Sequence, residues 1–152
     1  MSKIILLEDE YGPALLANSL IEIYKHEVDL ASDLREFIYL FEISRNKVKY
    51  DVILLDLTVP GIIDYEIPGT DDVRTCYDYE GMHGYRYFYD QRNIEFKNYT
   101  NRLAFYTAFS GKLKSRAKRD GIDINTYRIF NKADTSAEEI NNWIRNLPGF
   151  KT

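Results

Sequence analysis

The stretch Asp51-Val-Ile-Leu-Leu-Asp-Leu-Thr-Val-Pro-Gly61 decides the fold. Its segment 52–55 is continuously apolar and rich in β-branched and leucine side chains, which predicts a strand buried on both faces of a parallel sheet. Pro60 and Gly61 predict a sharp turn after it. Asp56 follows the apolar run at the carboxyl end of the strand, where open α/β sheets bind their ligands. Two interpretations of Asp56 stay open: a carboxylate of a functional site, or a cap of the following turn.

Length and composition limit the class of protein. A chain of 152 residues is expected to form one domain, 1–152, with a proper hydrophobic core. The formal net charge of −4 argues against nucleic acid as a partner, because nucleic-acid binding needs a basic face. The early apolar run at 4–7 is too short for a signal peptide or a membrane span. The lone Cys76 cannot form an internal disulfide, so we expect a soluble cytoplasmic protein without a membrane partner.

Hydrophobic periodicity predicts five strands that alternate with five helices. The strands are expected at 3–7, 28–31, 51–57, 103–109 and 127–130. The first helix is expected from Gly12-Pro13 to about His26, and the second after a cap at Ser32 or Asp33. The third is expected from Gly84 to about Asn93, and the fourth at 111–120. The fifth should begin after Ser136, where Glu139 completes a capping box. Such alternation predicts a parallel sheet with helices on both faces. His26, near a helix end, is interpreted as a surface residue.

Residues 62–80 interrupt this alternation with an acidic insertion. Arg74 is its single cation, no period is visible, and the segment is therefore expected to be a long loop. The acidic residues are Asp64, Glu66, Asp71, Asp72, Asp78 and Glu80. Since strands three and four should be neighbours, we expect the insertion to lie over the basic helix at 111–120. The tyrosines at 65, 77 and 79 would add contacts to those at 85, 87 and 89, and a mobile, solvated loop is the alternative.

Right-handed crossovers bring the carboxyl ends of all five strands to one edge of the sheet. The polar residues expected at this edge are Glu8, Asp9, Asp56, Thr107 and Lys132. Three carboxylates in one place repel each other, and a divalent cation relieves that repulsion. An all-oxygen set with few protein ligands suits Mg²⁺. Asp56 could then attack phosphorus, while Lys132 and Thr107 hold the oxygens of the transferred group.

The chain resembles the receiver domains of two-component response regulators over nearly its whole length except residues 62–80. The matching pieces are Leu6-Leu7-Glu8-Asp9, Asp51 to Gly61, Gly81-Met82-His83-Gly84-Tyr85, Tyr106-Thr107-Ala108 and Asn131-Lys132. The resemblance implies a flavodoxin-like (βα)5 three-layer sandwich with strand order 2-1-3-4-5. It also implies Asp56 as the phosphoacceptor, Glu8 and Asp9 as the metal-binding pair with the main-chain carbonyl of Thr58, and Thr107 and Lys132 beside the phosphoryl group.

Four positions depart from the family pattern. The family turn Pro-Gly-Met-Asp-Gly is split by the insertion into Pro60-Gly61 and 81–84, and His83 replaces its Asp, which we interpret as a loop residue. Ala133 follows Lys132 where the family usually has proline, so we expect a trans peptide there. Ile129 stands where the family often has a switching aromatic residue, and the adjacent Phe130 should face the opposite way.

We therefore expect a stand-alone receiver that is phosphorylated on Asp56, with Mg²⁺, by a histidine kinase or phosphotransfer protein. It would pass the signal to a downstream protein partner, with a homodimer left open, and would not be an enzyme that turns over a separate substrate. One alternative is a phosphorylation-independent interaction module on the same fold. Another is a phosphohydrolase with an Asp nucleophile, which is disfavoured because Thr58 stands where the dehalogenase-like pattern has a second Asp.

Overall fold

The computed structural model describes residues 2–9, 14–43, 49–60, 64–66, 71 and 73–149. Its main sheet contains β1 (Lys3–Leu7), β2 (Glu27–Ala31), β3 (Val52–Leu55), β6 (Leu103–Thr107) and β7 (Arg128–Asn131). The helices are α1 (Ala14–Glu22), α2 (Leu34–Ile38), α3 (His83–Gln91), α4 (Ser110–Arg119) and α5 (Ala137–Arg145). A π-helical turn, η1 (Tyr39–Ile43), extends α2, and a 3-10 turn, η2 (Ile124–Thr126), precedes β7. The predicted helix start at Gly12-Pro13 and the turn residue Gly61 lie outside the described residues.

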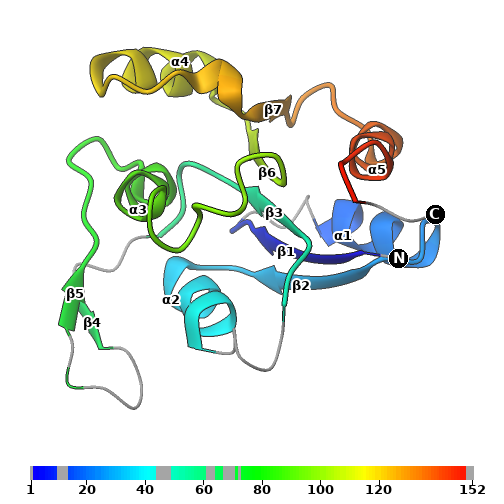
Figure 1. Ribbon diagram of the computed structural model, residues 1–152, viewed down its shortest axis with the longest axis horizontal. Coiled ribbons are helices and arrows are strands. Elements are labelled where there is room, and N and C mark those ends of the chain that lie inside the picture. Colours follow the sequence, from blue (N-terminus) through cyan, green and yellow to red (C-terminus); the bar gives the residue numbers. More distant parts are fainter. Residues whose placement is uncertain are drawn as a thin grey trace.

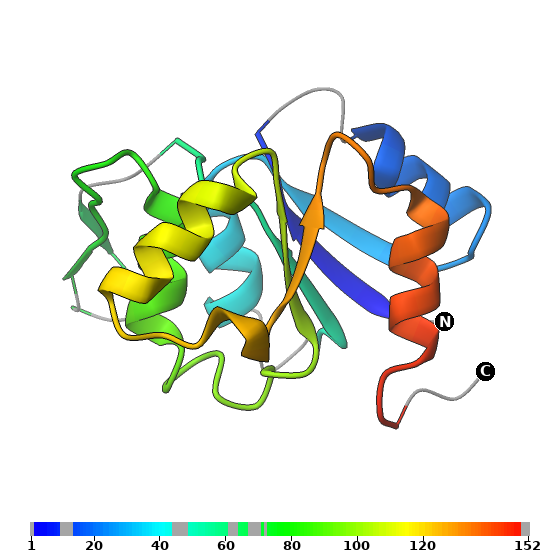
Figure 2. The ribbon, with the colours of Figure 1, turned by 90° about the horizontal axis from the view of Figure 1, so that it is seen from above.

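The sheet is fully parallel, with the strand order β2-β1-β3-β6-β7. This is the predicted order 2-1-3-4-5, because β4 and β5 belong to a separate hairpin that precedes β6 in the chain (Figure 1). Helices α1 and α5 cover one face of the sheet, and α2, α3 and α4 cover the other (Figure 2). The predicted flavodoxin-like three-layer fold is confirmed.

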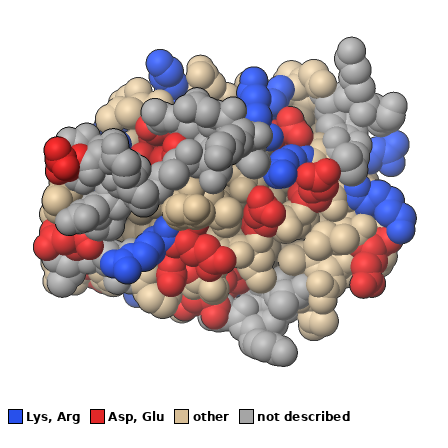
Figure 3. All heavy atoms as spheres, turned by 90° about the horizontal axis from the view of Figure 1, so that it is seen from below, with Lys and Arg blue, Asp and Glu red and all other residues tan. Residues whose placement is uncertain are grey.

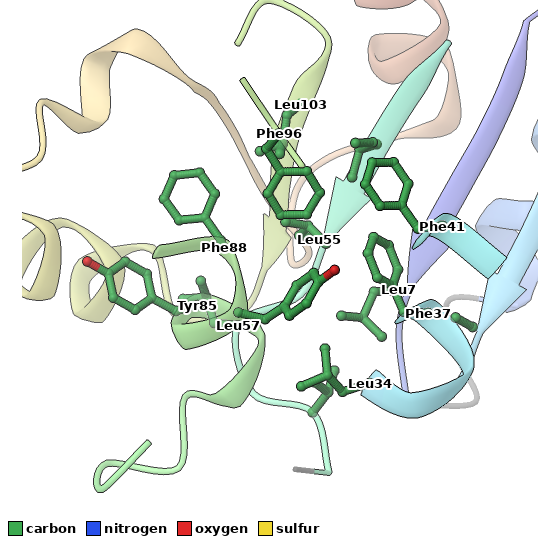
Figure 4. Close-up of a cluster of buried hydrophobic side chains, with 14 of the residues drawn as sticks. Leu7, Leu34, Phe37, Phe41, Leu55, Leu57, Tyr85, Phe88, Phe96 and Leu103 are labelled. Atoms are coloured by element: carbon green, nitrogen blue, oxygen red, sulfur yellow. The ribbon is translucent and has the colours of Figure 1, made fainter. Parts of the chain in front are cut away.

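Strand β3 lies at the centre of the sheet, and all four of its side chains are buried. Ile53 and Leu55 belong to the cluster beneath α2, α3 and α4, whereas Val52 and Leu54 belong to the cluster beneath α1 and α5. Burial on both faces explains why the 52–55 run is continuously apolar rather than alternating. The first cluster is markedly aromatic (Figure 4). Its ring contacts include Phe37 with Tyr87 and Phe88 with Phe105, in edge-to-face geometry.

Two predicted helix caps are present. Of the two candidates before α2, Asp33 is the cap, because its Oδ1 accepts a hydrogen bond from the Glu36 amide at 2.8 Å. The Ser136 hydroxyl accepts a hydrogen bond from the Glu139 amide at 3.2 Å and caps α5. These local signals fix where the two helices begin, as the sequence predicted.

The interpretation of His26 as a surface residue is wrong, because its side chain is only 4% exposed. Lys25 takes a positive φ of 60° and ends the turn after α1, so that the chain enters β2 with His26 directed inward. The Ser2 amide donates to His26 Nδ1 at 3.1 Å, and Nε2 lies 2.7 Å from Asn141 Oδ1 on α5. His26 therefore ties the start of the chain to α5.

The acidic insertion is not simply a loop, since it contains the short antiparallel hairpin of β4 (Asp64–Glu66) and β5 (Val73–Thr75). The Thr75 hydroxyl donates to the Asp64 carboxylate at 2.6 Å across the pair. The expectation of a segment without regular structure is wrong at these residues, because three-residue strands are too short to give a readable period. Asp72 and the side chains of Tyr65 and Glu66 lie outside the described residues.

Among the helices that the structure describes, none combines the length and the apolar character needed to cross a membrane.

Candidate functional site

The ends of β1 and β3 bring three carboxylates together at one edge of the sheet. The Asp56 amide donates to the Leu7 carbonyl at 3.1 Å, so Asp56 begins where the ladder between the two strands stops. One carboxylate oxygen from each of Glu8, Asp9 and Asp56 lies within 4.8 Å of the others. Glu8 and Asp56 are buried, each with 2% exposure, whereas Asp9 is exposed. The predicted convergence of these carboxylates is confirmed.

Lys132 reaches this cluster from the end of β7. Its Nζ lies 2.9 Å from Asp56 Oδ2 and also forms an ion pair with Glu8. Its amide donates to the Thr107 carbonyl at 3.0 Å, which fixes the backbone of Lys132 against the end of β6. Burial by itself would lower the pKa of Lys132, but the hydrogen bonds and charges of Glu8 and Asp56 outweigh it and raise that pKa. Lys132 is therefore a permanent cation between two buried carboxylates.

Burial raises the pKa of the Asp56 carboxyl group, because a charge is poorly solvated at the end of a fully buried strand. The hydrogen bond and the charge of Lys132 oppose this shift, as does the Leu57 amide, which donates to Asp56 Oδ1 at 2.7 Å. The Asp9 charge adds to the rise. A divalent cation among the three carboxylates would favour the ionised form of Asp56 in the same way as Lys132 does.

Thr107 and Thr58 belong to the two segments that flank this cluster in the chain, the end of β6 and the residues after β3. Thr107 ends β6 and is completely buried, and its hydroxyl accepts a hydrogen bond from the Phe109 amide at 3.0 Å. Thr58 is partly buried, two residues beyond Asp56. The assignment of its main-chain carbonyl as a metal ligand stays a prediction, as do the roles of the other site residues.

The departures from the family pattern have simple structural consequences. The peptide bond between Lys132 and Ala133 is trans, as expected, and the Ala133 amide donates to Asn131 Oδ1 at 3.0 Å. Ile129 packs beneath α2, α3 and α4, while Phe130 packs on the opposite face against Trp143. The interpretation of His83 as a loop residue is wrong, because His83 is the first residue of α3.

The acidic insertion is docked on α4, as predicted. Asp78 Oδ1 accepts a hydrogen bond from Arg116 Nη2 at 2.6 Å, and Glu80 pairs with Arg116 at 3.0 Å and also with Arg119. The Tyr79 ring lies 5.0 Å from the guanidinium of Arg116. On the face of the molecule shown in Figure 3, acidic and basic side chains are interspersed, and the described residues there form no continuous basic patch.

The other tyrosine contacts differ in detail from the expectation. Tyr77 packs near His83, with ring centroids 5.9 Å apart. The Tyr85 ring lies 5.1 Å from the guanidinium of Arg116, about as near as the Tyr79 ring. The insertion is also anchored on its other side, because Arg74 forms an ion pair with the buried Glu42 of η1. The insertion thus has anchors on both α4 and η1.

The sequence did not reveal that Arg116 and Asp78 are buried, with side-chain exposures of 3% and 0%. One signal was available. Leu113, Arg116 and Ala117 share one face of a helix by their spacing, and Leu113 and Ala117 are apolar. This spacing places Arg116 on the inner face of α4, where a cation needs a carboxylate partner.

No family model matches this sequence. No curated protein matches it in sequence either. Solved structures do match its fold. The bacteriophytochrome response regulator AtBRR has a TM-score of 0.62 at 17% identity, with 100% of this chain and 96% of that chain covered. The receiver domain of the Francisella response regulator 1452 has a TM-score of 0.57 at 18% identity, with coverages of 95% and 94%. The chemotaxis response regulator CheY4 of Vibrio cholerae has a TM-score of 0.58 at 18% identity, with coverages of 95% and 97%.

Proposed function

Because the chain has the fold of response regulator receiver domains, we propose that it is a signalling protein that accepts a phosphoryl group on Asp56. A single observation carries this proposal. Asp56 directly follows the central strand β3, its carboxylate clusters within 4.8 Å with those of Glu8 and Asp9, and it is paired with Lys132 at 2.9 Å. A nucleophilic carboxylate, two further acidic ligands and a fixed cation are the groups that phosphoryl transfer to a carboxylate requires.

The acidic cluster fits Mg²⁺. Its donors are carboxylate oxygens, and only Asp9 of the three residues is exposed, which suits a small cation that keeps several of its waters. Glu8, Asp9 and Asp56 would hold the cation, with the Thr58 carbonyl as a further ligand. When bound, the cation supplies positive charge that neutralises the oxygens of the incoming phosphoryl group.

The residues of the chain then have separate tasks in the transfer. An Asp56 carboxylate oxygen forms a bond to phosphorus while the bond between phosphorus and the donor's leaving group breaks. Lys132 favours the ionised form of Asp56 beforehand and would pair with phosphoryl oxygens afterwards. Thr107, whose hydroxyl oxygen accepts from the Phe109 amide, would donate its hydroxyl hydrogen to the same group. The product is an acyl phosphate on Asp56.

We propose a histidine kinase or a phosphotransfer protein as the donor, a downstream protein partner as the receiver of the signal, and the cytoplasm as the location. The protein would take part in its own phosphorylation without turning over a separate substrate.

The test is phosphate uptake from acetyl phosphate with Mg²⁺, followed by intact mass and by borohydride reduction of the acyl phosphate to locate it. We expect one phosphoryl group on wild type and on Asp71→Asn, a matched change of an exposed carboxylate in the insertion, and none on Asp56→Asn. A wild type that takes up no phosphate would instead support an interaction module that works without phosphorylation. Repeated turnover of phosphoesters would support a hydrolase.

A further inference from the structure

Asp78 organises the turn that leads into α3. Its Oδ2 accepts hydrogen bonds from the amides of Glu80 and Met82, both at 3.0 Å, and its carbonyl accepts one from the Gly81 amide at 3.0 Å. The Asp78 amide donates to His83 Nδ1 at 3.1 Å. A single residue, whose side chain is 0% exposed, therefore fixes the backbone from 78 to 83.

The same turn supports the backbone of the phosphoacceptor. One residue beyond His83, the Gly84 amide donates to the Leu57 carbonyl at 2.9 Å. Gly84 also lies so close to the Asp56 carbonyl oxygen that a Cβ atom on Gly84 would overlap with that oxygen. Leu57 in turn donates its amide to Asp56 Oδ1 at 2.7 Å. The position of the turn thus sets the position of the peptide that holds the Asp56 carboxylate.

Arg116 holds this turn from the side of α4. Its Nη2 lies 2.6 Å from Asp78 Oδ1, and its Nε lies 3.1 Å from Asp120 Oδ2, so the planar guanidinium is fixed at two points. The rings of Tyr79 and Tyr85 lie 5.0 and 5.1 Å from it and shield it from water. Helix α4 itself begins three residues after Thr107. The ion pair therefore links α4, through the turn at 78–83, to the backbone that follows Asp56.

We propose that Asp78 is a positioning residue for the phosphoacceptor site, and that its ion pair with Arg116 couples the loop after Asp56 to α4. This inference rests on the proposed function for its biological meaning. A buried pair of opposite charges separates only at high cost, so a shift of the loop when Asp56 is phosphorylated moves α4 with it. Coupling of this kind is reciprocal in free energy, so a protein that binds α4 also shifts the phosphorylation equilibrium of Asp56.

The experiment compares Asp78→Asn, Arg116→Met and the double variant with wild type. Two controls leave Arg116 and Asp78 with their partners: Arg119→Gln removes the more exposed ion pair of the same contact, and Asp71→Asn changes an exposed carboxylate of the insertion. The first readout is amide hydrogen exchange of Gly84 relative to Leu6 in the core of β1, in protein without phosphate. The second is the rate of phosphate uptake from acetyl phosphate. The ratio to Leu6 separates a local change from general loss of stability, because core amides report global unfolding.

We expect each single change at 78 or 116 to lower the relative protection of Gly84 about tenfold, and the uptake rate by a similar factor. The double variant should be no worse than the poorer single variant, because both changes break one pair. Arg116→Lys, which keeps the charge without the planar fork, should recover part of both readouts. The controls should stay within about twofold of wild type.

The proposal would be overturned if Asp78→Asn stayed within about twofold of wild type in both the relative protection of Gly84 and the rate of phosphate uptake. If Asp78→Asn does not fold, Arg116→Lys and Arg116→Met decide by the same criterion. The exchange readout needs no phosphorylation. A wild type that takes up no phosphate therefore rejects the proposed function, whereas unchanged Gly84 protection in the variants rejects the positioning role of Asp78.

Discussion

Gly84, the second residue of α3, lies directly against the main-chain carbonyl oxygen of Asp56. A Cβ atom at Gly84 would stand 2.1 Å from that oxygen and 3.1 Å from the carbonyl oxygen of Leu57. Both neighbours are backbone atoms next to the buried end of β3, so neither can move aside as a flexible side chain could. The close approach lets the Gly84 amide reach Leu57 and fixes α3 on the site.

Gly84→Ala should therefore destabilise the fold by about 1–3 kcal/mol, because the added methyl group must push α3 away from the sheet. Gly111→Ala is the matched control. Gly111 also lies inside a helix, α4, but a Cβ there meets nothing within 4 Å. We expect that change to stabilise by about 0.5–1 kcal/mol through helix propensity. Urea unfolding of both variants measures the difference, and equal effects of the two changes would contradict the close contact.

The raised pKa of Asp56 predicts how stability depends on pH in buffer without metal. The folded state holds the proton of Asp56 more tightly than the unfolded state, so this group stabilises the fold below its ordinary pKa, and that contribution is lost as pH rises. Asp56→Asn removes this pH dependence, because an amide does not ionise. The free energy of unfolding of the variant should therefore increase relative to that of wild type as pH rises above the ordinary pKa of an aspartate, about 4. Urea unfolding with a chelator present tests this, and a difference that shrinks with rising pH would refute the role of burial.

Mg²⁺ affinity should depend on pH for the same reason. The ligand carboxylates must be ionised, and burial disfavours the ionised form of Asp56, so affinity should increase as pH rises through its raised pKa. Calorimetric titration at several pH values measures this. Asp9→Ala and Asp56→Ala should each abolish binding in the accessible range, whereas Asp71→Asn should bind as wild type does. Binding that survives in Asp9→Ala would place the cation elsewhere.

Glu42, the second anchor of the insertion, should lose more stability when its ion-pair partner is replaced than when its hydrogen-bond donor is replaced. Glu42 is 5% exposed and accepts a hydrogen bond from the Tyr87 hydroxyl at 2.5 Å in addition to its ion pair with Arg74. Arg74→Met removes the counter-charge of a buried carboxylate and should cost about 1–3 kcal/mol, whereas Tyr87→Phe should cost about 0.5–1.5 kcal/mol.

Adding Glu42→Gln to Arg74→Met should recover part of that loss, because a neutral amide is less costly to bury than an unpaired carboxylate. Chemical denaturation gives the free energies, and hydrogen exchange at 73–75 reports whether β5 is released. A double variant no more stable than Arg74→Met would show that Glu42 does not depend on the charge of Arg74.

The strands and the acidic edge were predictable for a common reason. Continuous apolar runs such as 52–55 identify buried parallel strands, and parallel connections place all their carboxyl ends at one edge. Glu8, Asp56 and Lys132 could therefore be assigned to one site although they are far apart in the sequence. The docking of the insertion on α4 followed from opposite charges on neighbouring loops. The short hairpin at 64–75 gave no readable period, and His26 carried no signal of burial.

The amino-acid sequence by itself determined the order of the five main-sheet strands and their helices, the cap at Ser136, and the polar residues at the strand ends, because each depends on local pattern and chain direction. Only the tertiary structure decided which charges pair in the interior. Asp78 and Arg116 lie 38 positions apart, and Glu42 and Arg74 lie 32 apart. Such partners meet only when helices pack on the sheet and exclude water, and the cost of burying a lone charge then selects the pairs.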